Sequence, residues 1–248
     1  MSGGLRFPFL AQFLAVFSLS ICPSLGGSTE PQPLNRAYAV FVAHYNPQTQ
    51  EAVGGVMGTA FFVSKSQART AFHVLQPKSF QPMPGFTQVR VWLVHEGEPA
   101  LRLDARDLTY NSELDSTEIR LTTSQVKTHF VYSVSSQIDL QTAGSVVESE
   151  GFRVNSVGPR LQWMGSEIEV MSVPKLERLY ARGSVLRSAQ IDLKANDVTL
   201  QSAPCIQLSY EPIKGFSGGP VVHKGRVVAM NSFADPKTRQ QTWALLLN

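Results

Sequence analysis

From residue 37 onward, hydrophobic and polar residues alternate with a period of two in one short segment after another. No segment keeps the long apolar repeat of 3.6 residues that marks an amphipathic helix. The chain therefore predicts an all-β fold of about a dozen short strands, arranged as a barrel or a sandwich. The candidate strands, separated by Gly, Pro, Asn and Ser, are Ala37–Tyr45, Gly55–Val63, Gln88–His95, Leu101–Tyr110, Thr117–Leu121, His129–Val134, Glu167–Val173, Ile206–Tyr210, Pro220–Val222, Arg226–Asn231 and Thr242–Leu247.

Composition narrows the functions that such a fold can have. The 248 residues are 43% hydrophobic, which is enough to fill a core and excludes disorder for the bulk of the chain. The formal net charge is +3, without a long basic run, so nothing indicates a nucleic-acid partner. Two cysteines, Cys22 and Cys205, are too few for a disulfide framework or a CxxC metal cluster. We expect neither a metal nor a cofactor.

The N-terminus has the pattern of a secretory signal peptide. One positive charge, Arg6, precedes an apolar stretch from Phe7 to Ile21, and small residues follow up to Gly26. This stretch is shorter than the roughly 20 apolar residues that cross a bilayer, so we predict no membrane span. A lipid anchor on Cys22 is disfavoured, because bulky Ile21 stands where lipidation motifs have a small residue. We predict a signal peptide over 1–26, a linker over 27–36, and a secreted or periplasmic domain over 37–248.

The hexapeptide Gly215–Pro220, which reads GFSGGP, is the segment most suggestive of chemistry. Its three glycines let the backbone turn sharply around Ser217 and expose N–H groups. A serine hydroxyl becomes a nucleophile when a base takes its proton, and the N–H groups of Gly215 and Ser217 can stabilise the oxyanion that forms. The other interpretations are a glycine-rich hairpin turn and an α/β-hydrolase elbow. The elbow fails because only 31 residues follow Ser217, with His223 as the sole histidine.

Three segments together resemble the trypsin-like serine endopeptidases. They are Met57–Ser64 (MGTAFFVS), Ala68–Leu75 (ARTAFHVL) and the Ser217 hexapeptide, within a likeness that extends over residues 37–247. The chain resembles in particular the secreted bacterial members of the glutamyl-endopeptidase and heat-shock protease types. The resemblance implies two antiparallel six-stranded β-barrels that meet between residues about 122 and 160, with the active site in the cleft between them.

In this family a histidine and an aspartate from the first barrel act with a serine from the second. The resemblance places the histidine at His73 and the nucleophile at Ser217. His73 would take the serine proton and return it to the leaving amine, while the aspartate fixes the imidazole tautomer. The other histidines (His44, His95, His129 and His223) have no metal-ligand spacing and are interpreted as structural.

Two positions are candidates for the aspartate. Asp115 lies 42 residues after His73 and is followed by Thr117, Ile119 and Leu121, which form a credible strand. Asp139 lies 78 residues before Ser217, also a familiar interval, but Gln141 and Gly144 make a poorer strand after it. We choose Asp115 and keep Asp139 as the alternative.

The leading hypothesis is a serine endopeptidase that hydrolyses peptide bonds through an acyl-enzyme. Its partners would be protein or peptide substrates, and we expect a monomer. The alternative is a catalytically silent relative that uses the double barrel as a binding module. Intact His73 and Ser217 argue against that alternative, because such relatives usually lose one of the two.

Glu211 is the one candidate for substrate specificity. It lies six positions before Ser217, where relatives that cleave after Lys or Arg have an acidic residue at the base of the pocket. A buried carboxylate there would favour a cationic side chain. The competing interpretation is a solvated loop glutamate beside Pro212. Glutamyl specificity is disfavoured, because the segment from Met230 to Phe233 lacks a histidine that could bind a substrate carboxylate.

Overall fold

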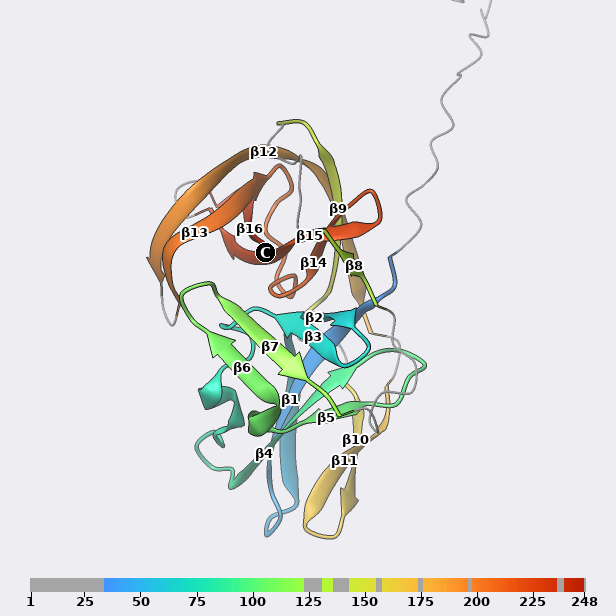
Figure 1. The fold of residues 1–248 in the computed structure, drawn as a ribbon. Helices are drawn as coiled ribbons and strands as arrows, with labels where there is room; N and C mark the ends of the chain where they lie inside the picture. The colour runs from blue at the N-terminus through green and yellow to red at the C-terminus, as the bar shows by residue number, and fades with distance from the viewer. Residues whose placement is uncertain are drawn as a thin grey trace, which may run out of the picture. The chain divides into compact units, whose positions relative to one another are not determined.

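The computed structural model describes residues 34–122, 131–135, 143–154, 158–173, 176–195, 198–235 and 239–247 (Figure 1). These residues form two seven-stranded sheets and a separate two-stranded hairpin. The signal peptide predicted for residues 1–26 and most of the predicted linker over 27–36 lie outside them. Within the described ranges, no helix has the length and apolar character needed to cross a membrane.

The first sheet contains the N-terminal half of the described chain and has the order β5-β4-β1-β2-β3-β7-β6. Its two edges belong to one stretch of chain, because β5 pairs with β4, β6 pairs with β7, and only the short 3-10 helix η2 separates them. The sheet is therefore a six-stranded barrel whose fifth strand is interrupted. The elements are β1 (Ala37–Asn46), β2 (Glu51–Ser64), β3 (Gln67–Thr70), the 3-10 helix η1 (Pro77–Phe80), β4 (Gln88–Val94), β5 (Leu101–Leu103), η2 (Ala105–Asp107), β6 (Leu108–Asn111) and β7 (Ser116–Arg120).

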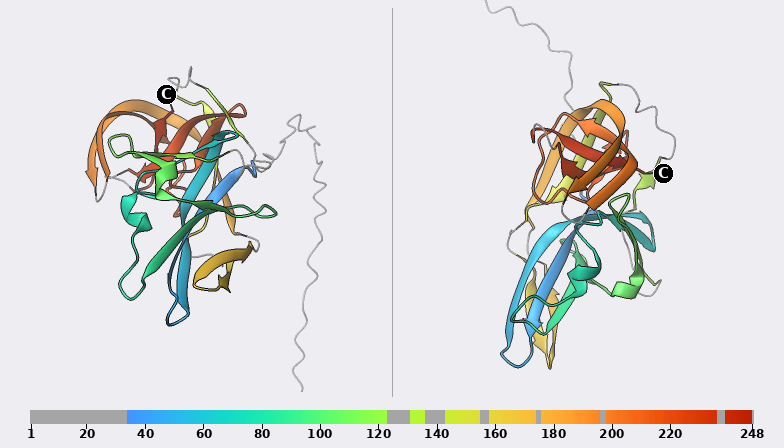
Figure 2. Two further views of the ribbon diagram at one scale, coloured as in Figure 1. Left: turned by 60° about the horizontal axis from the view of Figure 1, so that its bottom comes forward. Right: turned by 90° about the vertical axis from the view of Figure 1, so that its left-hand side faces the viewer.

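The second sheet closes on itself through hydrogen bonds. Strand β14 pairs with β9 on one side and with β15 on the other, which completes a ring of six antiparallel strands (Figure 2). The short strand β8 adds to β15 in parallel. The elements are β8 (Ser133–Val134), β9 (Val146–Phe152), β12 (Arg178–Ala195), β13 (Val198–Leu208), β14 (Pro220–His223), β15 (Arg226–Ala234) and β16 (Thr242–Leu246).

The hydrophobic core follows the period of two along β1. Tyr38 and Val40 belong to the largest buried cluster, which contains residues of both sheets. The intervening Ala39 and Phe41 pack in a second cluster together with the hairpin of β10 (Arg160–Met164) and β11 (Glu167–Ser172). Successive side chains of a strand point to opposite faces, so β1 is buried on both sides.

The all-β class and the two-barrel architecture predicted from the sequence are confirmed. The strands differ from those expected in several places: β3, β9, β10 and β12 were not predicted, and β13 begins at Val198 rather than at Ile206. The segment predicted as one strand from Leu101 to Tyr110 is interrupted at Asp104, where η2 begins. The longest strand, β12, was missed. Among its described side chains only Val185 is fully buried, while the alternating Ala189, Ile191 and Leu193 are partly buried against the core, and the strand pairs with β9 and β13.

Candidate active site

His73 and Asp115 lie together although 42 residues separate them in the chain. His73 is in the turn after β3, and Asp115 is in the turn between β6 and β7. The imidazole Nδ1 lies 2.9 Å from both carboxylate oxygens, and the backbone N–H of His73 donates to Oδ1 at 3.0 Å. A carboxylate only accepts, so Nδ1 carries the proton and Nε2 is left as the acceptor.

The Asp115 side chain is completely buried, whereas 29% of the His73 side chain is exposed. A further donor to the carboxylate comes from the second barrel, where the Ser232 hydroxyl on β15 bonds to Oδ2. The sequence analysis assigned no role to Ser232, since no local pattern links it to a residue 117 positions away. Three donors fix the orientation of the buried carboxylate.

Ser217 lies in the loop between β13 and β14, and backbone contacts hold this loop against the first barrel. The Thr59 N–H of β2 donates to the Ser217 carbonyl at 2.9 Å. Gly218 has φ +79°, and a Cβ at this position would lie 2.8 Å from the nitrogen of Ala71, two residues before His73. The Ser217 loop therefore packs directly against the turn that carries His73.

The backbone of this loop leaves two N–H groups without acceptors. Gly215 has φ +102°, and a Cβ would lie 1.6 Å from the Phe152 carbonyl oxygen, so only glycine fits there. Within the described residues, the N–H groups of Gly215 and Ser217 donate no hydrogen bond. The other three N–H groups of the hexapeptide donate hydrogen bonds to backbone carbonyls. Phe216 donates to Ile213, Gly218 to Asn231 and Gly219 to Phe216.

A small pocket of about 50 Å³ lies beside Ser217. Its walls include Pro212 and Ile213 from the loop and Phe233 and Ala234 from the end of β15. Glu211 is exposed and is not one of the lining residues, which favours the solvated loop glutamate. Its role in specificity stays a prediction.

Asp139, Cys22 and Cys205 were also singled out in the sequence analysis. Asp139 and Cys22 lie outside the described residues. Cys205 is buried, and burial, followed by the negative charge of Asp115, raises the pKa of its thiol to about 12, so it is no nucleophile at neutral pH. In the part of the chain that the structure describes, no group of three His, Cys, Asp or Glu side chains is arranged to hold a metal ion.

A second fully buried carboxylate, Glu150 on β9, was not singled out by sequence. Its Oε1 accepts hydrogen bonds from the N–H groups of Arg36 at 2.9 Å and Ala37 at 2.7 Å and from the Tyr132 hydroxyl, while Oε2 lies 3.3 Å from an Arg178 nitrogen. Burial and the charge of Glu150 raise the pKa of Tyr132 well above its usual range, so this phenol stays a donor. The cluster fixes the start of β1 to the second barrel.

Comparison with solved structures finds the same fold in known proteases. One match is the active form of the Rv3671c protease of M. tuberculosis, with a TM-score of 0.50 and 16% sequence identity. The alignment covers 86% of this chain and 76% of that protease chain. The HtrA-type protease AlgW, solved with a decapeptide, matches 86% of this chain with a TM-score of 0.53 and 13% identity, and this chain covers 61% of AlgW. No protein-family model and no curated protein sequence matches the chain. The chain has the double-barrel fold of the trypsin-like serine endopeptidases.

Proposed function

We propose that the protein is a serine endopeptidase in which Ser217 is the nucleophile, His73 the general base and Asp115 the residue that orients it. The contact of the His73 Nδ1 with the buried Asp115 carboxylate carries this proposal. It leaves Nε2 free to accept the Ser217 proton and then to protonate the leaving amine. The resulting acyl-enzyme is hydrolysed when His73 activates a water molecule in the same way.

The oxyanion of each tetrahedral intermediate would be stabilised by the N–H groups of Gly215 and Ser217. Both belong to a loop whose neighbouring N–H groups are bound internally, so the two donors are preorganised. Such donors act without reorganisation during the reaction, and each contributes roughly 3 to 4 kcal/mol to transition-state stabilisation.

The substrates would be proteins or peptides, consistent with the decapeptide in the AlgW structure. We place the mature protein outside the cytoplasm, after removal of residues 1–26, and expect it to be a monomer. No step of this mechanism needs a metal or a cofactor. The alternative, a silent binding module, is an outcome of the test below.

A fluorophosphonate probe tests the proposal because it reacts with serines activated by a neighbouring base. We expect one probe per chain on Ser217 in the folded protein, located by peptide mass spectrometry. Labelling should be absent in Ser217→Ala, strongly slowed in His73→Ala, and abolished by prior heat unfolding. Ser209→Ala, which alters an exposed serine in the same connection, is the matched control. A folded wild-type protein that takes up no probe would support the binding module instead.

A further inference from the structure

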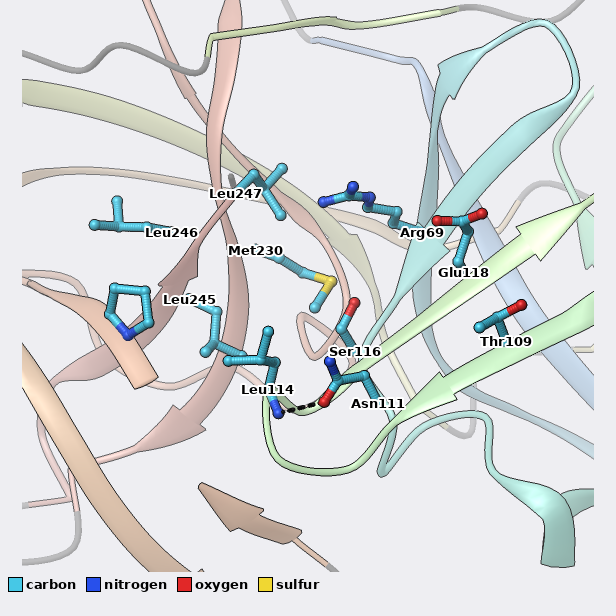
Figure 3. Close-up of a pocket in the computed structure, with 11 residues that line it drawn as sticks. Arg69, Thr109, Asn111, Leu114, Ser116, Glu118, Met230, Leu245, Leu246 and Leu247 are labelled. Carbon is cyan, nitrogen blue, oxygen red and sulfur yellow. Dashed lines mark hydrogen bonds between the residues drawn. The ribbon is translucent and has the colours of Figure 1, made fainter. Parts of the chain in front are cut away.

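A cavity of about 250 Å³ lies between the two barrels, lined by β3, β6 and β7 of the first and by β13, β15 and β16 of the second, with the adjoining chain (Figure 3). It is separate from the small pocket beside Ser217, and Met230, which is absent from that pocket, contributes to its wall. Its volume exceeds the roughly 150 Å³ of a cavity that admits benzene, so it has room for a small organic molecule.

One side of the cavity presents hydrogen-bond donors. The Arg69 side chain extends toward Leu247, and the Ser116 hydroxyl and Asn111 amide lie on the same side (Figure 3). The Asn111 Oδ1 accepts from the Leu114 N–H at 3.0 Å, which leaves the Nδ2 hydrogens for a ligand. Guanidinium, amide and hydroxyl donors grouped in this way suit a carboxylate.

One positively and one negatively charged side chain line the cavity, those of Arg69 and Glu118. Arg69 is partly buried and lies opposite Glu118 on the neighbouring strand, and its guanidinium forms no ion pair with a described residue. The one acidic residue of the lining, Glu118, already binds the Arg120 Nε at 2.6 Å. Burial raises the pKa of Glu118, but hydrogen bonds from Arg120 and Gln67 and the positive charges of Arg120 and Arg69 outweigh it and lower this pKa, so the carboxylate stays ionised. Because Arg120 is the ion-pair partner of Glu118, the Arg69 guanidinium keeps its hydrogen-bond donors for a ligand.

The opposite side is apolar. Leu245, Leu246 and Leu247 line it together with Pro204, Met230 and Leu114. A ligand that neutralises Arg69 would therefore place an apolar tail against these side chains, which gains free energy from burial.

The cavity also adjoins the turn that holds Asp115. Leu114 and Ser116, the two neighbours of Asp115, both line it, and Asp115 itself has a strained φ of +40°. On the other wall, Met230 is two residues before Ser232, whose hydroxyl binds the Asp115 carboxylate. A ligand in the cavity would contact both segments that position this carboxylate.

We infer that this cavity is a binding site for a small organic carboxylate with an apolar tail, and that a bound ligand perturbs the Asp115 turn. The Arg69 guanidinium binds the carboxylate, and the leucines of the C-terminal strand hold the tail. The chemistry is shared by a medium-chain fatty acid and by the free C-terminus of a leucine-rich dipeptide. This inference does not depend on the reactivity of Ser217.

The test uses the purified protein with two probes, octanoate and N-acetyl-Leu-Leu, titrated by calorimetry and by ¹H–¹⁵N NMR. We expect saturable binding of at least one probe with a dissociation constant between about 0.1 and 5 mM, as befits a ligand of this size. Octanol and N-acetyl-Leu-Leu amide, which lack the carboxylate, should bind at least about tenfold more weakly. The probe that binds more tightly shows whether the site favours a fatty acid or a peptide C-terminus.

Variants assign the binding to the cavity. Arg69→Gln should weaken binding about tenfold or more, Arg69→Lys should restore part of it, and Glu118→Gln should strengthen it. Arg106→Gln removes a positive charge from an 84% exposed side chain of the same barrel and should leave binding unchanged. The amide signals of Leu114, Asp115 and Ser116 should move on titration of the wild type.

Several results would overturn the inference. They are the absence of saturable binding of both probes up to about 20 mM, equal losses in Arg69→Gln and Arg106→Gln, or binding that leaves the Asp115 turn unperturbed. All three readouts are independent of proteolysis, so a protein that binds octanoate but fails to react with a fluorophosphonate would refute the proposed function alone.

Discussion

Asp115 and Glu150 are both completely buried carboxylates, one in each barrel, and each accepts hydrogen bonds from both main chain and side chain. They differ in the partner that carries positive charge. Asp115 contacts the imidazole of His73, which is 29% exposed and has a proton-accepting nitrogen, whereas Glu150 contacts the guanidinium of Arg178, which is 11% exposed and has only donors.

This difference separates a carboxylate that can orient a catalytic histidine from a carboxylate with a structural role. A buried carboxylate bound to fixed donors can only stabilise the fold, because none of its partners can exchange a proton at neutral pH. A buried carboxylate bound to a partly exposed imidazole controls which ring nitrogen carries the proton, and so controls what the ring can do at its other nitrogen. Burial alone therefore identifies neither role.

We expect the largest effect on activity from a substitution of Asp115. Asp115→Asn keeps the shape but lets the imidazole adopt the wrong tautomer, so we expect kcat to fall by about four orders of magnitude while the fold survives. Peptide-cleavage kinetics and a thermal melt measure both. The matched variant is Asp139→Asn, which should cleave at nearly the wild-type rate. If Asp139→Asn loses activity and Asp115→Asn retains it, the assignment of the triad aspartate is wrong.

The second effect concerns stability. All four partners of Glu150 donate hydrogen bonds, so in Glu150→Gln the new NH₂ group faces donors and Arg178 loses its counter-charge. We expect the free energy of unfolding to fall by about 3 kcal/mol and the melting temperature by roughly 6 to 12 °C. At temperatures below the melting temperature of the variant, its kcat should stay within about twofold of the wild-type value.

Glu148→Gln is the control for this experiment. Glu148 lies two residues earlier on β9, its side chain is 32% exposed, and it is 4.0 Å from Arg182, so its loss should cost less than about 1 kcal/mol. A Glu150→Gln protein of wild-type stability that no longer cleaves peptides would contradict the separation of the two carboxylates.

The sequence predicted the parts of the site that depend on local backbone. The glycines at 215 and 218 are required because their left-handed conformations bring the loop against Phe152 and Thr59, and this requirement is visible in the hexapeptide itself. The strand leading to His73 likewise carries its own pattern. The all-β class followed from the period of two in most of the strands, and the two-barrel architecture from the resemblance to the trypsin-like endopeptidases.

The sequence could not predict partners brought together only by the fold. Asp115 and Asp139 have equally acceptable intervals to His73 and Ser217, and chain distance cannot say which turn meets the imidazole. Ser232 is 117 residues from Asp115, and Glu150 is 113 residues from Ala37. Strand β12 has only one fully buried side chain among those described, Val185, and its register against β13 shifts twice, so its length follows from its two neighbouring strands.

Glu211 provides the smallest expected effect and extends the comparison to a carboxylate without a buried partner. Its side chain is exposed, it makes no hydrogen bond or ion pair with a described residue, and it lies outside the pocket beside Ser217. An exposed charge is screened by water and salt, so Glu211→Gln should change kcat/KM for substrates with Arg, Lys or a neutral residue before the scissile bond by less than about twofold. A matched set of three fluorogenic peptides, compared at low and physiological ionic strength, measures this. A selective loss of at least tenfold for the Arg and Lys peptides would instead place the carboxylate in the substrate pocket and establish a preference for basic residues.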